Sequence, residues 1–96
     1  ENINCKHVFH LYVVYHPKRD KIITKLKENN ILVNINYPFP IHKMKAYNSP
    51  AYIKHNRLPI SEKISKGIFS LPLYPNLKEN EVLKISKILK KILKTI

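Results

Sequence analysis

The stretch Asn36–His42 reads Asn-Tyr-Pro-Phe-Pro-Ile-His, and Leu71–Pro75 has a similar character, reading Leu-Pro-Leu-Tyr-Pro. These two blocks hold four of the seven prolines of the chain. Each proline fixes its own φ and lacks an N–H donor, and the residue before it is restrained to extended geometry. The chain is therefore predicted to be stiff and open at two places, as suits a surface that meets a ligand or another domain. We call Asn36–His42 the proline-rich loop.

Three stretches around these blocks have the composition or the alternation of β-strands. His7–Tyr15 is rich in Val, Phe, Tyr and Leu and has apolar residues on both faces, which predicts a strand covered on both sides. Ile31–Ile35 has apolar residues at its odd positions, which predicts a half-buried strand. Ile68–Leu73 is the third predicted strand.

Two helices are expected before the final segment of the chain. The first spans Asp20–Asn30, where apolar residues recur with helical spacing and the closing asparagines tolerate a left-handed cap. The second spans Pro59–Gly67 and has one apolar face. Its start is placed at Pro59 because Pro is well suited to a first helical turn. Arg19 is expected to cover the start of the first helix, and Glu62 to support the start of the second.

The last helix is expected to begin at Asn76 or Leu77 and to run to the end of the sequence. Its first turn contains acidic residues and its last turn contains lysines, the polarity that the helix dipole favours. The predicted buried stripe consists of Val82, Ile85, Ile88, Leu89, Ile92 and Ile96.

This order of elements predicts an α+β fold, with helices packed on one face of a small antiparallel or mixed three-stranded sheet. The connection over residues 37–58 is long and is expected to hold a short helical turn near Met44–Tyr47. Connections of this length in a compact domain are usually functional or packed against something. With 96 residues, the chain can bury one modest core, and we interpret residues 1–96 as a single domain.

The formal net charge of +12 invites a nucleic-acid or membrane-surface interpretation. All basic residues except Arg19 and Arg57 are lysines, whereas phosphate and base recognition favours the guanidinium fork. The chain is also rich in Ile and Asn, so A/T-rich codons offer an explanation of the charge that needs no binding partner. An RNA-binding α+β module remains the alternative function, although the usual stacking motif with Gly between aromatics is absent. The apolar stripe of the last helix is explained more simply by packing over the core than by binding to a membrane surface.

The remaining chemical groups favour no catalytic or metal site within this chain. Cys5 is a single cysteine, which is consistent with a reducing compartment, and no stretch approaches the length of a membrane span. With no leader visible at Glu1, a cytoplasmic location is expected. His7 and His10 lie on opposite faces of a predicted strand and cannot chelate one metal ion.

Five stretches, in this order and spacing, resemble the C-terminal small domain of the DegT/DnrJ/EryC1/StrS sugar aminotransferases. They are His7–Val14, Arg19-Asp20 with Leu26–Asn29 downstream of it, the proline-rich loop with Ala46-Tyr47 after it, Pro59–Lys63 and Leu71–Pro75. The family consists of pyridoxal-phosphate enzymes of fold type I. The resemblance implies that a large domain, with the Schiff-base lysine and the groups that bind the cofactor, is missing here.

The resemblance further implies an enzyme that transfers an amino group from glutamate to a keto nucleotide-sugar, in aminosugar or cell-surface polysaccharide biosynthesis. Family members are usually homodimers, and the small domain walls one side of the active-site cleft. No residue of this chain is expected to be catalytic or to bind the cofactor or a metal, so the chain alone is predicted to be inactive. Its partners are then its own large domain and the nucleotide-sugar, without nucleic acid or membrane.

Three residues of the proline-rich loop are the candidates for substrate binding: Asn36, Tyr37 and His42. Tyr37 offers a ring face, and His42 offers a hydrogen bond to sugar or phosphate groups. The alternative is that both side chains pack against the large domain. Relatives usually have His where this chain has Asn36, and Asn cannot titrate near neutral pH, so an acid–base role at that position is in doubt.

Overall fold

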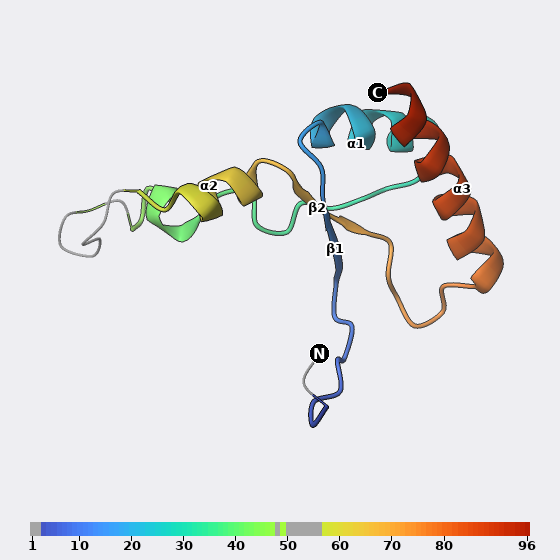
Figure 1. Ribbon diagram of the computed structural model, residues 1–96, viewed down its shortest axis with the longest axis horizontal. Coiled ribbons are helices and arrows are strands. Elements are labelled where there is room, and N and C mark those ends of the chain that lie inside the picture. Colours follow the sequence, from blue (N-terminus) through green and yellow to red (C-terminus); the bar gives the residue numbers. More distant parts are fainter. Residues whose placement is uncertain (1–2, 48, 50–56) are drawn as a thin grey trace.

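The computed structural model describes residues 3–47, 49 and 57–96. Its elements are, in order, β1 (Tyr12–Tyr15), α1 (Arg19–Glu28), the 3-10 helix η1 (Ile41–Lys43), α2 (Pro59–Ser65), β2 (Ile68–Leu71) and α3 (Glu79–Thr95). The predicted α+β class is confirmed. Helices α1 and α3 lie side by side on one side of the sheet, and α2 extends away from it on the other (Figure 1). The predicted connection over residues 37–58 includes residues 48 and 50–56, which lie outside the described residues.

The sheet consists of two antiparallel strands, β1 and β2, in which Tyr12 pairs with Leu71 and Tyr15 pairs with Ile68. This pairing stops at Leu71 because Pro72 follows, and a proline offers no N–H to a ladder. The predicted strand over Ile68–Leu73 is therefore two residues shorter in the structure.

The expected third strand is not present among the described residues, which is a correction to the predicted three-stranded sheet. Ile31–Ile35 contributes one isolated bridge, between Asn34 and Ser70, with backbone N···O distances of 3.2 and 2.7 Å. The alternation itself is correct, because Ile31 is buried and Leu32 is 75% exposed. The segment cannot extend the ladder past the bridge, since the prolines of the proline-rich loop soon follow.

The first strand is also shorter than expected, and one of its faces is open. The predicted strand over His7–Tyr15 begins only at Tyr12, because the four-residue β2 leaves the residues before it without a partner. Phe9 has a φ of 51°, which interrupts extended geometry. Val14 packs against the core, while Val13 and Tyr15 on the opposite face are exposed, so the prediction of a strand covered on both sides is wrong for this chain.

Local signals place the end of α1 within two residues and the start of α3 within three. Asn30 adopts the left-handed conformation with a φ of 57°, as expected for the residue that ends α1. Helix α3 begins at Glu79, two or three residues later than expected, and the Glu81 carboxylate accepts a hydrogen bond from the Lys78 N–H at 2.9 Å. This bond satisfies one of the free backbone donors at the start of the helix.

The hydrophobic core lies between the sheet, α1 and α3. The buried side chains are Ile22, Leu26, Ile31, Phe69 and Ile92. Most of the predicted stripe of α3 packs against this cluster, namely Ile85, Ile88, Leu89, Ile92 and Ile96. Val82 is an exception, because it lies on the exposed first turn of the helix.

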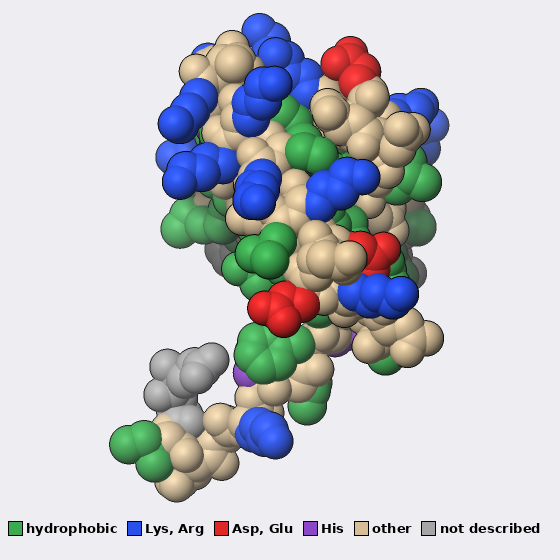
Figure 2. All heavy atoms as spheres, turned by 90° about the vertical axis from the view of Figure 1, so that its right-hand side faces the viewer, with side chains coloured by type: hydrophobic (Ala, Val, Ile, Leu, Met, Phe, Trp, Pro, Cys, Tyr) green, Lys and Arg blue, Asp and Glu red, His purple; other side chains and the backbone are tan. Residues whose placement is uncertain are grey.

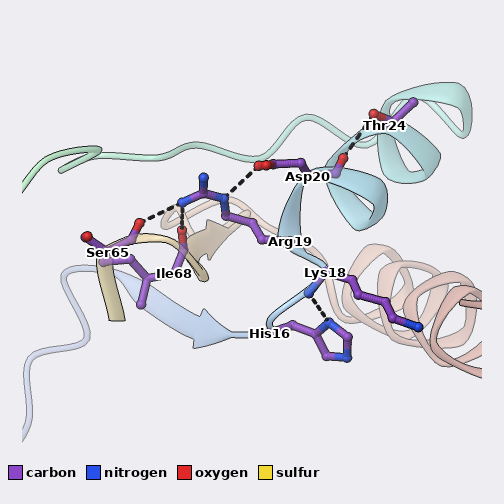
Figure 3. Close-up of polar contacts among 7 residues, drawn as sticks. All are labelled: His16, Lys18, Arg19, Asp20, Thr24, Ser65 and Ile68. Atoms are coloured by element: carbon purple, nitrogen blue, oxygen red, sulfur yellow. Dashed lines mark hydrogen bonds and ion pairs between the residues drawn. The ribbon is translucent and has the colours of Figure 1, made fainter. Parts of the chain in front are cut away.

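Helix α2 contributes no buried residue, although its sequence has an apolar face. Ile60 is 73% exposed. Polar bonds connect the helix to the rest of the fold instead. The half-buried Arg19 donates from Nη1 to the Ser65 carbonyl at 2.8 Å and to the Ile68 carbonyl at 3.4 Å (Figure 3). The Ser65 carbonyl lies in the last turn of α2, where acceptors have no partner within the helix, and the Ile68 carbonyl belongs to β2.

Gly67 allows the chain to turn from α2 into β2 against β1. A Cβ atom at this position would clash with the Tyr15 ring and the His16 carbonyl oxygen. The Gly67 carbonyl also accepts a hydrogen bond from the His16 N–H at 2.9 Å. The single glycine of the sequence is therefore required by close packing at the end of the sheet.

Replacing Leu26 by Ala should lower the free energy of unfolding of the chain by about 2–5 kcal/mol, because it leaves a cavity between α1, α3 and the sheet. Leu32→Ala is the matched control, and its exposed side chain predicts a loss of at most about 0.5 kcal/mol. Urea unfolding followed by circular dichroism measures both values. Equal losses in the two variants would contradict this description of the core.

Candidate functional site

The proline-rich loop and α2 form the two sides of a surface groove with a volume of about 440 Å³. Residues 36–41 and Met44 line one side, and Ser61, Ile64, Ser65 and Ile68 line the other. The lining is mainly apolar, and the loop presents the exposed side chains of Tyr37, Phe39 and Ile41 beside it. Exposed apolar patches of this kind mark surfaces that bind a ligand or another domain.

Asn36 lies at the end of the groove nearest the sheet. Its Oδ1 accepts a hydrogen bond from the Ser70 hydroxyl at 2.8 Å. Ser70 is buried in β2, so the bond connects the loop to the centre of the sheet. Asn36 is a candidate from the sequence, but Ser70 is not. The alternation of Ile31–Ile35 predicts that Asn34 and Asn36 share a face, but it does not identify the strand that lies beside them.

Tyr37 is 71% exposed and lines the groove beside Asn36. The neighbouring Pro38 restrains its backbone to extended geometry. Asn36 and Tyr37 are thus brought together at one site, with a polar amide next to an aromatic ring.

His42 lies in η1, at the far end of the loop, and is not among the described residues that line the groove. It is 8% exposed, and its Nε2 lies 2.9 Å from Glu62 Oε1. The ring therefore joins the loop to α2, on the opposite wall of the groove.

Glu62 Oε1 has two hydrogen-bond partners and one ammonium group nearby. Besides His42, its Oε1 accepts a hydrogen bond from the Leu58 N–H at 3.2 Å and lies 3.6 Å from Lys43 Nζ. The Leu58 bond confirms that Glu62 supports the start of α2. The hydrogen bond from His42, then the one from Leu58 and then the nearby Lys43 charge lower the pKa of this carboxyl from its ordinary value of 4.5.

The described lysines lack the surroundings that a Schiff-base lysine needs. A Schiff-base lysine needs burial or a neighbouring cation to become nucleophilic at neutral pH. Every described lysine is exposed except Lys25, which is half-buried and donates to the Thr95 hydroxyl at 3.3 Å. Within the described part of the chain there is also no group of three His, Cys, Asp or Glu side chains that could hold a metal ion.

Viewed from the side of α3, many Lys and Arg side chains gather on the upper part of the molecule, with apolar and other groups between some of them (Figure 2). No helix of the described residues has both the length and the apolar character needed to cross a membrane.

Comparison with known proteins identifies the family. The model of the DegT/DnrJ/EryC1/StrS aminotransferase family matches residues 1–90. A dTDP-3-amino-3,4,6-trideoxy-alpha-D-glucose transaminase of Micromonospora megalomicea subsp. nigra is 44% identical over 75% of this chain and 19% of its own length. A pleiotropic regulatory protein of Geobacillus stearothermophilus is 43% identical over 78% of this chain and 20% of its own length.

A solved structure agrees with these relatives. The crystal structure of S. venezuelae DesV in complex with a ketimine intermediate matches with a TM-score of 0.81 and 27% identity, over 90% of this chain and 23% of that one. The chain thus belongs to the DegT/DnrJ/EryC1/StrS aminotransferase family. It spans about a fifth of the length of the curated relatives described above.

The Glu62→Gln substitution should make the stability of the chain less dependent on pH in the acidic range. Because folding lowers the pKa of Glu62, its ionised form stabilises the fold above the ordinary value of 4.5, and this contribution disappears as the pH falls through the lowered value. The difference in unfolding free energy between wild type and Glu62→Gln should therefore be present at pH 7 and shrink below pH 4.5. Thermal unfolding across this pH range measures it.

Glu28→Gln, at the exposed end of α1, controls for the removal of one negative charge from a chain of net charge +12. If the difference in unfolding free energy between wild type and Glu62→Gln grew as the pH falls, the ionised carboxylate would not be the stabilising form.

Proposed function

We propose that residues 1–96 are the C-terminal small domain of a pyridoxal-phosphate-dependent enzyme that transfers an amino group from glutamate to a keto nucleotide-sugar. The product would serve aminosugar or cell-surface polysaccharide biosynthesis. The observation that carries the proposal is the family match over residues 1–90. The likeness to the DesV structure and the printed activity of the Micromonospora relative support it. The RNA-binding alternative is not favoured by these findings.

In this proposal the cofactor belongs to a large domain outside the 96 residues. Pyridoxal phosphate supplies the electron sink for amino-group transfer. The described lysines do not fit the Schiff-base role, which supports placing the reactive lysine elsewhere in the polypeptide. The exposed apolar side chains around the groove support a lobe that packs against further protein.

The proline-rich loop then forms part of the wall of the substrate cleft. The prolines keep the loop extended without help from a ladder, so Asn36 and Tyr37 remain presented at the groove. Tyr37 would offer its ring face to the sugar or base, and Asn36 would offer its amide. His42 would contribute from the other end of the loop, where it also binds Glu62.

The 96-residue chain should retain no pyridoxal-phosphate absorbance after dialysis, because the cofactor groups lie outside it. The full-length enzyme should retain the cofactor and form glutamate from 2-oxoglutarate and dTDP-3-amino-3,4,6-trideoxy-alpha-D-glucose, the amino sugar named for the Micromonospora relative, or from another sugar in a panel of dTDP- and UDP-linked amino sugars. Stoichiometric cofactor retention by the 96-residue chain would contradict the assignment of the cofactor site to the large domain. Failure of the full-length protein on the whole panel would contradict the activity.

Replacing His42 by Ala in the full-length enzyme should raise the KM for the nucleotide-sugar by about threefold to tenfold, the loss expected for one hydrogen bond to the substrate. His10→Ala, in the exposed segment before β1, is the matched control. Steady-state kinetics with varied nucleotide-sugar measures the effect. An unchanged KM in the His42 variant would contradict a hydrogen bond to the substrate and leave His42 only the role of joining the loop to α2.

A further inference from the structure

The hydrogen bond between Ser70 and Asn36 lies where the sheet meets the groove. Ser70 is in β2 and is buried, whereas Asn36 is exposed and lines the groove. The Ser70 hydroxyl donates to Asn36 Oδ1 at 2.8 Å. An amide has one acceptor oxygen and one NH2 group with two donors. With its oxygen engaged by Ser70, the amide has its NH2 group on the side of Cγ away from that hydroxyl.

Backbone hydrogen bonds hold the two residues of this contact in place. Ser70 and Asn34 exchange two backbone hydrogen bonds, of 3.2 and 2.7 Å, at the isolated bridge. Residues two apart on an extended segment share a face, so this bridge places the side chain of Asn36 diagonally across from Ser70. The position of the hydroxyl is therefore determined by the sheet and not by the loop.

We propose that Ser70 is a positioning residue, which holds the Asn36 amide with its NH2 group facing the groove as a fixed donor to an acceptor oxygen of the ligand. This inference rests on the proposed function and deepens it. The ligand group is an oxygen that carries lone pairs toward the loop, as a sugar hydroxyl, a carbonyl or a phosphate does. Because the groove is mainly apolar, a donor of fixed direction discriminates strongly between ligand groups that do and do not accept it.

A double-mutant cycle in the full-length enzyme tests the proposal, with dTDP-3-amino-3,4,6-trideoxy-alpha-D-glucose and 2-oxoglutarate as substrates, or the amino sugar of the panel that the wild type turns over fastest. Ser70→Ala and Asn36→Ala should each raise the KM for the amino sugar by about threefold to tenfold. The double variant should show the same KM as Asn36→Ala, and kcat should change by less than about twofold, since neither residue touches the reacting atoms.

Thr24→Ala is the control, because it removes a hydroxyl that donates to the Asp20 carbonyl at 3.0 Å on the exposed side of α1, and its KM should equal that of the wild type. Asn36→Asp provides a measurement that does not depend on the stability of the Ser70 variant. The carboxylate still accepts from Ser70 but presents no donor to the ligand, so its KM should rise at least as much as that of Asn36→Ala.

An unchanged KM in Ser70→Ala, an additive effect in the double variant, or a wild-type KM in Asn36→Asp would each overturn the role of Ser70 while leaving the proposed function intact. Absence of turnover by the wild type on the whole panel would overturn the proposed function, and this inference with it.

Discussion

Strand β2 is the element on which the rest of the structure depends. Its four residues pair with β1 on one edge, and Ser70 forms the bridge to Asn34 on the other. Phe69 enters the core from the same strand, where α1 and α3 cover it. One short strand therefore supports the helical layer and the start of the proline-rich loop. Pro72 sets its length, because a residue without an N–H ends the ladder.

Helix α2 is held to this framework by polar bonds and not by burial. Arg19 binds the Ser65 carbonyl at its end, and His42 binds Glu62 near its start. A short helix without buried residues gains little from the hydrophobic effect, so such bonds determine where it lies. The groove between α2 and the loop follows from them, since each wall is bonded to the other at His42.

These features suit a lobe that works with additional protein. The apolar side chains of Tyr37, Phe39, Ile41 and Ile60 remain exposed although the chain has a core of its own. The family match and the small share of the relatives' length that the chain covers agree with this interpretation. In the proposed enzyme the lobe contributes shape and hydrogen bonds, and the cofactor contributes the chemistry.

The sequence by itself determined the features that depend on neighbours along the chain. The spacing of Ile22 and Leu26, the left-handed Asn30 and the alternation of Ile31–Ile35 are local, and they were predicted correctly. The same local logic identified the proline-rich loop and the support that Glu62 gives to α2. The strands predicted in this way are too long, because the length of a strand depends on the distant segment with which it pairs.

Only the tertiary structure decided which distant groups meet. Ser70 and Asn36 are 34 positions apart, and His42 and Glu62 are 20 positions apart. Arg19 and Ser65 are separated by 46 positions. No periodicity connects residues at such separations, since hydrogen-bond partners depend on how the elements pack and not on the order of the residues.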